Sequence, residues 1–212
     1  MQKRRRHVIS YVLGGIALGF IALSILVSFF PQSFIDVDLS REIQEDQNPT
    51  LNNLMILASW FGYSPGCIIT VAAAALIFLL FKYRREALFV LFTGLAGLVS
   101  TAFKILVNRP RPAEPIVHIV RKISQQSFPS GHVLFYIVYF GFLTVLMYQL
   151  KTIPKIVRIA VAVISLLLIF TIPFSRIYLG AHWFTDVLGG FLLGMLCLYI
   201  LCFFYFRKPV GK

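Results

Sequence analysis

The sequence contains few charged residues and very few cysteines. Asp, Glu, Lys and Arg make up 13% of its 212 residues, whereas a typical soluble domain has about 25%. This deficit argues against a water-soluble globular protein. The three cysteines, Cys67, Cys197 and Cys202, all fall within apolar segments. Their positions indicate neither a disulfide framework nor a metal site, so we infer neither.

Acidic residues are scarcer than basic ones. Eight Asp and Glu stand against 20 Lys and Arg, which gives a formal net charge of +12. Such an excess can indicate nucleic-acid binding. Here the basic residues lie at the ends of apolar runs, which favours topology signals and contact with anionic lipid. We therefore expect the bilayer, and no nucleic acid, as a partner.

Long apolar runs are abundant. Apolar residues make up 58% of the chain and the mean hydropathy is +0.83. We predict an all-α integral membrane protein, a single domain over residues 1–212, built as a bundle of six transmembrane helices of the length a bilayer requires. The predicted spans are about 8–30, 64–81, 87–107, 132–150, 155–174 and 183–206. Residues 51–61 could add an interfacial helix before the second span.

The distribution of basic residues sets the orientation. With the N-terminus inside, the alternating inside segments carry most of the Lys and Arg residues, namely 3–6, 82, 84, 85, 151, 155, 158, 207, 208 and 212. The outside segments carry fewer, at positions 41, 104, 109, 111, 121, 122 and 176. The positive-inside rule therefore predicts a plasma-membrane protein with both termini in the cytoplasm.

Three short polar clusters interrupt the apolar sequence. They are Lys104 with Arg111-Pro112, then Pro129-Ser130-Gly131-His132, then Ser175-Arg176 with His182 and Asp186. Charge near a membrane is costly and usually serves function. The topology above places all three clusters at the outer face, so they can form one site.

His182 and Asp186 have the spacing of residues on one helical face. A carboxylate there can bind one ring nitrogen, fix the tautomer and leave the other nitrogen free to attack. The alternative is a His–Asp pair that only joins two helices.

The second cluster begins the fourth predicted span. Unpaired N–H groups at a helix N-terminus suit an anion, Gly131 lets the backbone approach a phosphate, and Ser130 could cap the helix or donate to a phosphate oxygen. His132 could protonate a leaving group. Alone, however, these four residues are equally consistent with a simple helix cap.

The first and third clusters also contain three cationic side chains. Lys104, Arg111 and Arg176 could neutralise a phosphate, Arg in a bidentate manner. The alternative for Arg111 is an anchor to lipid headgroups, a role that Arg109, Arg121 and Lys122 could also have.

Together the three clusters resemble, in order and spacing, the signature of the type-2 phosphatidic-acid phosphatase family: Lys104, six residues, Arg111-Pro112; PSGH at 129–132; Ser175-Arg176, five residues, His182, three residues, Asp186. The resemblance covers about residues 60–206. Members are six-span membrane lipid phosphatases whose active site is similar to that of vanadium-dependent haloperoxidases. The family spacing selects Arg111 from the doublet at 109–112 and leaves Arg109 without a role.

The resemblance implies a role for each matched residue. His182 would be the nucleophile that forms a phosphohistidine, Asp186 would orient it, and His132 would be the general acid. The phosphate would be bound by Lys104, Arg111, Ser130, Gly131 and Arg176, with Ser175 as a helix cap or a supporting residue. No metal or cofactor is expected, because the only carboxylate in the motifs is paired with His182 and no acidic cluster remains for Mg²⁺.

The predicted function is dephosphorylation of a membrane lipid phosphate or diphosphate at the extracytoplasmic face. Undecaprenyl diphosphate, phosphatidylglycerophosphate and phosphatidic acid are the candidate substrates. A lipid phosphotransferase with the same nucleophile and a non-catalytic lipid transporter or scaffold remain alternatives.

Some further features are less specific. The GxxxG spacings at Gly15–Gly19 and Gly190–Gly194 permit close helix packing, within the fold or in a homo-oligomer. We expect Tyr178, Trp183 and Phe184 at the membrane interface. His118 has no assigned role.

Overall fold

The computed structural model describes residues 2–120 and 123–207, with side chains described from His7 onward, and in these residues it contains helices and no β-strand. The predicted all-α membrane fold is confirmed. The helices are α1 (Gln2–Phe29), α2 (Phe34–Gln44), α3 (Pro49–Ser59), the 3₁₀ turn η1 (Trp60–Gly62), α4 (Ser64–Leu80), α5 (Arg84–Phe92), α6 (Leu95–Val107), α7 (Gly131–Gln149), α8 (Lys155–Tyr178) and α9 (Phe184–Phe206).

Among the residues that the structure describes, five helical segments are long and apolar enough to cross a bilayer. They are α1 from His7, α5 and α6 together over Arg84–Val107, α7, α8 and α9. A sixth is obtained when α3 with η1 and α4 are counted as one span, bent by 58°. The prediction of six spans therefore holds when α4 is counted with the preceding bent helix.

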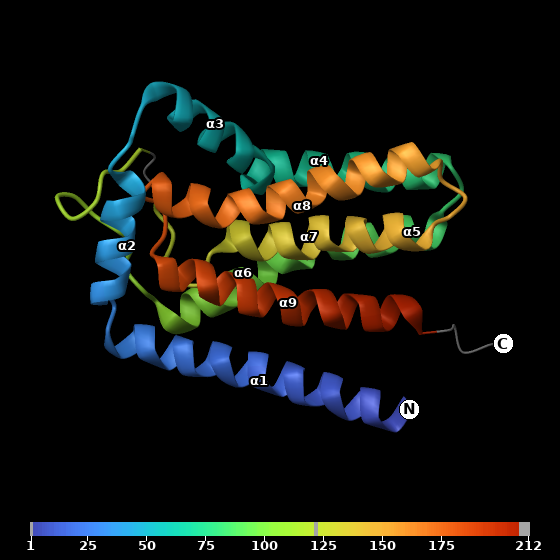
Figure 1. The fold of residues 1–212 in the computed structure, drawn as a ribbon, viewed down its shortest axis with the longest axis horizontal. Helices are drawn as coiled ribbons and strands as arrows, with labels where there is room; N and C mark the ends of the chain where they lie inside the picture. The colour runs from blue at the N-terminus through green and yellow to red at the C-terminus, as the bar shows by residue number, and fades with distance from the viewer. Residues whose placement is uncertain (1, 121–122, 208–212) are drawn as a thin grey trace.

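The long helices run side by side, whereas α2 lies across one end of the bundle (Figure 1). The same end holds the C-terminal end of α6 and the N-terminal ends of α7 and α9. The start of α1 and the end of α9 lie at the opposite end. This arrangement brings the loops that carry the three polar clusters together.

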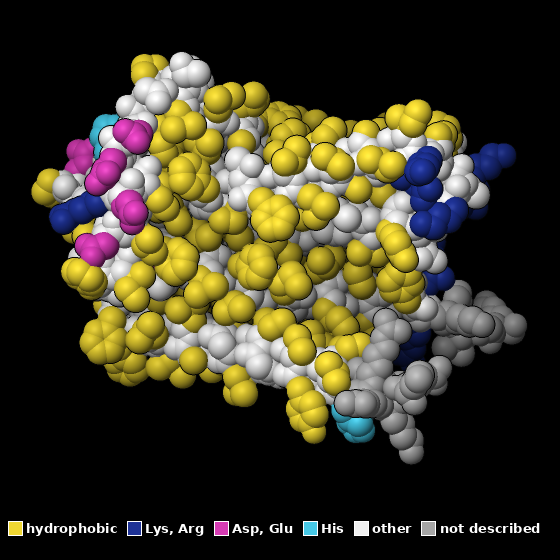
Figure 2. Space-filling model, viewed as in Figure 1, with side chains coloured by type: hydrophobic (Ala, Val, Ile, Leu, Met, Phe, Trp, Pro, Cys, Tyr) yellow, Lys and Arg dark blue, Asp and Glu magenta, His cyan; other side chains and the backbone are white. Residues whose placement is uncertain are grey.

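Acidic and basic side chains gather at opposite ends of the helix bundle (Figure 2). On the face shown in Figure 2, apolar side chains cover the middle of the molecule, acidic side chains gather near α2, and Lys and Arg gather at the other end. An apolar band between two charged ends is the surface that a bilayer requires. Arg121, Lys122, Lys208 and Lys212, which the orientation argument used, lie outside the described residues.

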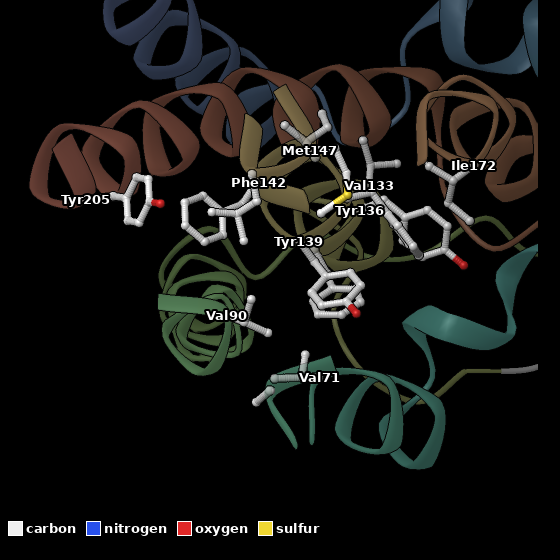
Figure 3. Packing of buried hydrophobic residues seen from close by; sticks show 14 of the residues in the cluster. Val71, Val90, Val133, Tyr136, Tyr139, Phe142, Met147, Ile172 and Tyr205 are labelled. Atoms are coloured by element: carbon white, nitrogen blue, oxygen red, sulfur yellow. The ribbon is translucent and has the colours of Figure 1, made fainter. Parts of the chain in front are cut away.

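Helix α7 forms the centre of the bundle. In its most apolar stretch 67% of the residues are buried, compared with 11% for α1 and for α8. A helix that is apolar on every side is suited to this position. Phe142 and Tyr136 of α7 are fully buried, and Figure 3 shows them packed with residues of α4, α5, α8 and α9.

Two helices form where the sequence is polar. Ser33 caps α2, since its hydroxyl accepts the Asp36 N–H (3.2 Å) and donates to the Asp36 carboxylate (2.8 Å). Asn48 caps α3 by accepting the Leu51 N–H at 2.9 Å, with Pro49 as the first helical residue. The helix predicted for 51–61 therefore begins two residues earlier.

Helix α8 is longer than predicted. It continues past residue 174 and through Pro173 to Tyr178, so Ser175 and Arg176 lie in its last turns. Ser175 is consequently not a helix cap. Tyr178 and Trp183 are fully buried, and the interpretation as membrane-interface residues is wrong for both. The reason is that both side chains point into the bundle, where the Tyr178 hydroxyl donates to Asn52 Oδ1 at 2.8 Å.

Glycine allows α9 to approach α7 closely. A Cβ added at Gly190 would lie 2.6 Å from the Ser130 carbonyl oxygen, and one at Gly194 would lie 3.0 Å from Ile137 Cβ. The Gly190–Gly194 spacing therefore serves packing within the fold. The close approach also allows the Ser130 N–H to donate to the Asp186 carbonyl at 2.9 Å, which joins the second and third clusters.

Candidate active site

A cavity of about 700 Å³ lies among α4, α6, α7 and the connection between α8 and α9. Lys104, Arg111, Gly131, His132 and His182 all line it. The structure thus places members of all three sequence clusters around one space. Ser130, Ser175, Arg176 and Asp186 lie behind this wall and are each fully buried.

His182 lies in the short connection between α8 and α9 and is 2% exposed. Its Nδ1 is 3.6 Å from Asp186 Oδ2 and 3.5 Å from Ser127 Oγ, while its Nε2 is 3.3 Å from a guanidinium nitrogen of Arg111. Burial, together with Arg111, Lys104 and Arg176, holds the pKa of His182 well below 6.5. The ring is therefore neutral at pH 7. We assign its proton to Nδ1, which faces a carboxylate, and this leaves a lone pair on Nε2, the nitrogen beside Arg111.

Both carboxylate oxygens of Asp186 accept hydrogen bonds. Its Oδ2 accepts the Trp183 N–H at 2.9 Å, which caps α9, and also accepts the Ser127 hydroxyl. Its Oδ1 accepts from Arg109 at 2.6 Å. The carboxylate is thus fixed on both oxygens beside His182, although His182 itself precedes the first helical residue, Phe184.

The second cluster begins α7 but does not use Ser130 as a side-chain cap. The Ser130 hydroxyl and His132 Nε2 are both buried and make no hydrogen bond to the described residues. Buried polar atoms without partners are costly and are uncommon outside functional sites. Gly131 and His132 nevertheless line the cavity, so the N-terminus of α7 opens onto it.

Lys104 and Arg111 bind the same loop. Lys104, 5% exposed in the last turn of α6, donates to the Gln126 carbonyl. Arg111 donates to the Gln125 and Ala181 carbonyls, both at 2.5 Å. Burial, together with neighbouring Arg176, lowers the pKa of Arg111 to about 10, despite the opposing effect of Asp186. Arg111 therefore stays charged at neutral pH.

Arg176 is held from the side of α3 and η1. Its guanidinium donates to Ser59 Oγ and to the Tyr63 hydroxyl (3.2 Å), and it lies 5.5 Å from the Tyr63 ring centre. Ser175 Oγ lies 2.7 Å from Ser59 Oγ and 3.3 Å from the Arg176 guanidinium. Ser175 is thus a supporting residue for Arg176 and lies away from the cavity surface.

Several residues of the site were not predicted. Arg109, which we considered as a headgroup anchor, is 1% exposed and binds Asp36 and Asp186, because the chain turns inward after α6. Ser127 and Tyr63 had no motif to identify them. The RPRP doublet at 109–112 was the only sequence signal for Arg109.

His118 lies apart from the cavity lining. Its side chain is exposed, and its backbone N–H and carbonyl bind the side chain of Gln44 at 3.0 and 2.9 Å. Within residues 2–120 and 123–207, no three His, Cys, Asp or Glu side chains are grouped as a metal site would require.

Residues 85–209 match the model of the PAP2 superfamily. The chain belongs to this superfamily. The matched range contains all three clusters, whereas α1 to α4 lie before it.

Two PAP2 relatives are similar over most of their length. Phosphatidylglycerophosphatase B of Bacillus subtilis is 33% identical over 175 residues, which cover 78% of this chain and 80% of the relative. The undecaprenyl-diphosphatase of Sulfolobus acidocaldarius is 30% identical over 163 residues, 75% of this chain and 73% of the relative.

Solved structures agree with the fold. The crystal structure of a transmembrane PAP2-type phosphatidylglycerolphosphate phosphatase from Bacillus subtilis has a TM-score of 0.74 at 26% identity, covering 92% of this chain and 96% of that one. Aquifex aeolicus LpxE has a TM-score of 0.62 at 22% identity, covering 81% and 96%, and supports the fold alone.

Proposed function

We propose that this protein removes a terminal phosphate from a membrane lipid phosphate or diphosphate through a phosphohistidine on His182. The observation that carries the proposal is the placement of His182, which lines the cavity with its Nε2 3.3 Å from Arg111 and its Nδ1 3.6 Å from Asp186. A neutral, oriented imidazole beside fixed cations can attack an anionic phosphate. The names of the PAP2 relatives support lipid phosphates as substrates.

The first step forms a bond from His182 Nε2 to phosphorus and breaks the bond from phosphorus to the lipid-side oxygen. His132, which is charged once the anionic phosphate lies beside it, gives that oxygen a proton. Lys104, Arg111 and the N-terminus of α7 line the cavity and stabilise the charge on the phosphoryl oxygens, and Arg176 and Ser130 support this from behind the cavity wall. Asp186 stabilises the positive imidazole ring of the intermediate.

The second step releases the phosphate. His132, now neutral, takes a proton from water, and the water oxygen attacks phosphorus as the bond to Nε2 breaks. Inorganic phosphate leaves and both histidines return to their starting protonation states. The scheme needs no metal ion.

The cavity also has room for the lipid. Apart from the charged residues, the cavity is lined by apolar side chains of α4 and α5, namely Ile68, Val71, Ala72 and Leu91. An apolar chain can lie there while its phosphate reaches His182. Phosphatidylglycerophosphate, undecaprenyl diphosphate and phosphatidic acid all have this form, with an apolar chain beside a phosphate.

We place the protein in a cytoplasmic membrane with the site outward. The separation of acidic and basic ends in Figure 2 supports this orientation, since basic residues favour the cytoplasmic side. The site lies at the acidic end, with α2.

The purified protein in detergent should release inorganic phosphate from at least one of the three lipids, and His182→Ala should abolish release while keeping lipid binding. His118→Ala, which changes an exposed histidine, is the matched control and should retain activity. Phosphate release by His182→Ala at the wild-type rate would refute the nucleophile. Vanadate should inhibit, because it mimics five-coordinate phosphorus.

The same experiment separates the alternatives. A phosphotransferase would place radiolabelled phosphate on an added lipid or sugar acceptor instead of releasing it. A transporter or scaffold would release none from any lipid phosphate.

A further inference from the structure

Two buried ion pairs that share Arg109 join the N-terminal part of the chain to the carboxylate beside His182. Arg109 donates to Asp36 Oδ2 at 2.7 Å and to Asp186 Oδ1 at 2.6 Å, and all three side chains are fully buried. The same guanidinium reaches Thr185 Oγ1 at 2.7 Å and the Pro31 carbonyl at 2.9 Å. Arg109 thus has partners on α2, on α9 and on the turn between α1 and α2.

Asp36 is equally well bound. It accepts the Thr185 N–H and hydroxyl, both at 2.9 Å, and the Ser33 hydroxyl at 2.8 Å. Thr185 is the residue before Asp186. Asp36 therefore fixes both Arg109 and the start of α9. It lies outside the range that the PAP2 family model matches, 85–209.

The charges explain why two carboxylates surround one arginine. A single Arg–Asp186 pair would be electrically neutral, and the carboxylate would then do little for a positive ring on His182. With Asp36 present, the three groups carry one net negative charge next to His182. Buried ions need such partners, because an unpaired one costs several kcal/mol.

We infer that Arg109 and Asp36 are positioning residues for catalysis, an inference that rests on the proposed function. Arg109 holds Asp186 Oδ1, so that Oδ2 faces His182 Nδ1. Asp36 fixes and balances Arg109, which leaves the charge of Asp186 available to His182. The α1–α2 segment is therefore part of the catalytic unit, and neither residue touches the substrate.

The test is Asp36→Asn, with Asp38→Asn as control because Asp38 is an exposed carboxylate on the same helix. We expect kcat per folded molecule to fall by about 10–100-fold, the range found for outer partners of ligating histidines, with KM within about threefold. Asp38→Asn should match the wild type. Folded protein is measured by size exclusion and thermal unfolding in detergent.

Arg109→Lys keeps a buried charge but loses the planar fork that binds two carboxylates at once. It should also lower kcat more than it raises KM, and it provides the test if Asp36→Asn does not fold. Arg41→Lys, at an exposed arginine of α2, is its control.

Two results would overturn the inference. One is a kcat per folded molecule within about twofold of wild type in both variants. The other is a loss explained entirely by less folded protein. In either case an active wild type and an inactive His182→Ala would leave the proposed function standing, whereas an active His182→Ala would refute that function itself.

Discussion

The ring of His132 lies directly on the backbone of Gly62. A Cβ added at Gly62 would lie 2.3 Å from His132 Cδ2 and 2.8 Å from Cγ, closer than real side chains approach. The neighbouring Tyr63 ring packs edge-on against the same imidazole at a centre-to-centre distance of 4.6 Å. The proposed general acid is therefore held in place by η1 and the residue after it.

Gly62→Ala should displace the His132 ring and lower kcat by about 10²-fold, the loss that a misplacement of about 1 Å can cause in a catalytic group. Steady-state phosphate release measures the effect. Gly14→Ala, at an exposed glycine of α1 away from the cavity, is the control, because a Cβ there meets no atom within 4 Å. Wild-type kcat in Gly62→Ala would contradict the role given to the His132 position.

Ser59→Ala should weaken phosphate binding. Ser59 Oγ accepts from Arg176 and is fully buried, so its loss removes a bond to a charged group, worth about 1.5–3 kcal/mol. We expect a KM increase of about tenfold or more, with smaller effects on kcat. Ser28→Ala, at an exposed serine of α1, should leave KM unchanged. An unaltered KM in Ser59→Ala would show that Arg176 does not depend on this contact.

The protonation of His182 should depend on pH in a defined direction. Burial and three cations lower its pKa, so protonation, which removes the Nε2 lone pair, occurs only at a more acidic pH than the usual value of about 6.5. NMR titration of ¹⁵N-histidine protein, with the resonance assigned by its loss in His182→Ala, should show a neutral ring at pH 6.5. Half-protonation at that pH would contradict the lowered pKa.

Phe142→Ala should destabilise the bundle. Phe142 is 0% exposed at the centre of α7 and packs against Tyr205 of α9 with 5.4 Å between ring centres. Removing a buried Phe costs about 3–5 kcal/mol. Thermal unfolding in detergent should show a clear decrease for this variant. Phe170→Ala, at a residue 75% exposed, should have little effect, and equal decreases would contradict the central position of α7.

The sequence predicted the helices well because bilayer spans are long, apolar and bounded by charge. It also predicted which polar clusters would meet, since topology alone assigns loops to a membrane face. The end of α8 was predicted too early, at residue 174, because the polar Ser175 and Arg176 end the apolar run, whereas the helix continues to Tyr178.

The supporting residues could not be predicted in the same way. Asp36 is one of several acidic residues between the first two spans, and nothing in its local pattern distinguishes it from the exposed Asp38. Ser59 and Gly62 lie in an ordinary apolar helix end. Their roles depend on how that segment packs against residues 70 or more positions away, which local sequence does not determine.

The loop before α7 would compete with the proposed substrate for two cations. Lys104 and Arg111 already donate to the carbonyl oxygens of Gln125 and Gln126. An arriving phosphate must therefore exchange these hydrogen bonds for its own, and the net gain in free energy is smaller than the number of its contacts suggests. In the proposed mechanism, the same exchange would help inorganic phosphate to leave, because the carbonyls would recapture both cations. A phosphate clamp built in this way favours turnover over tight product binding.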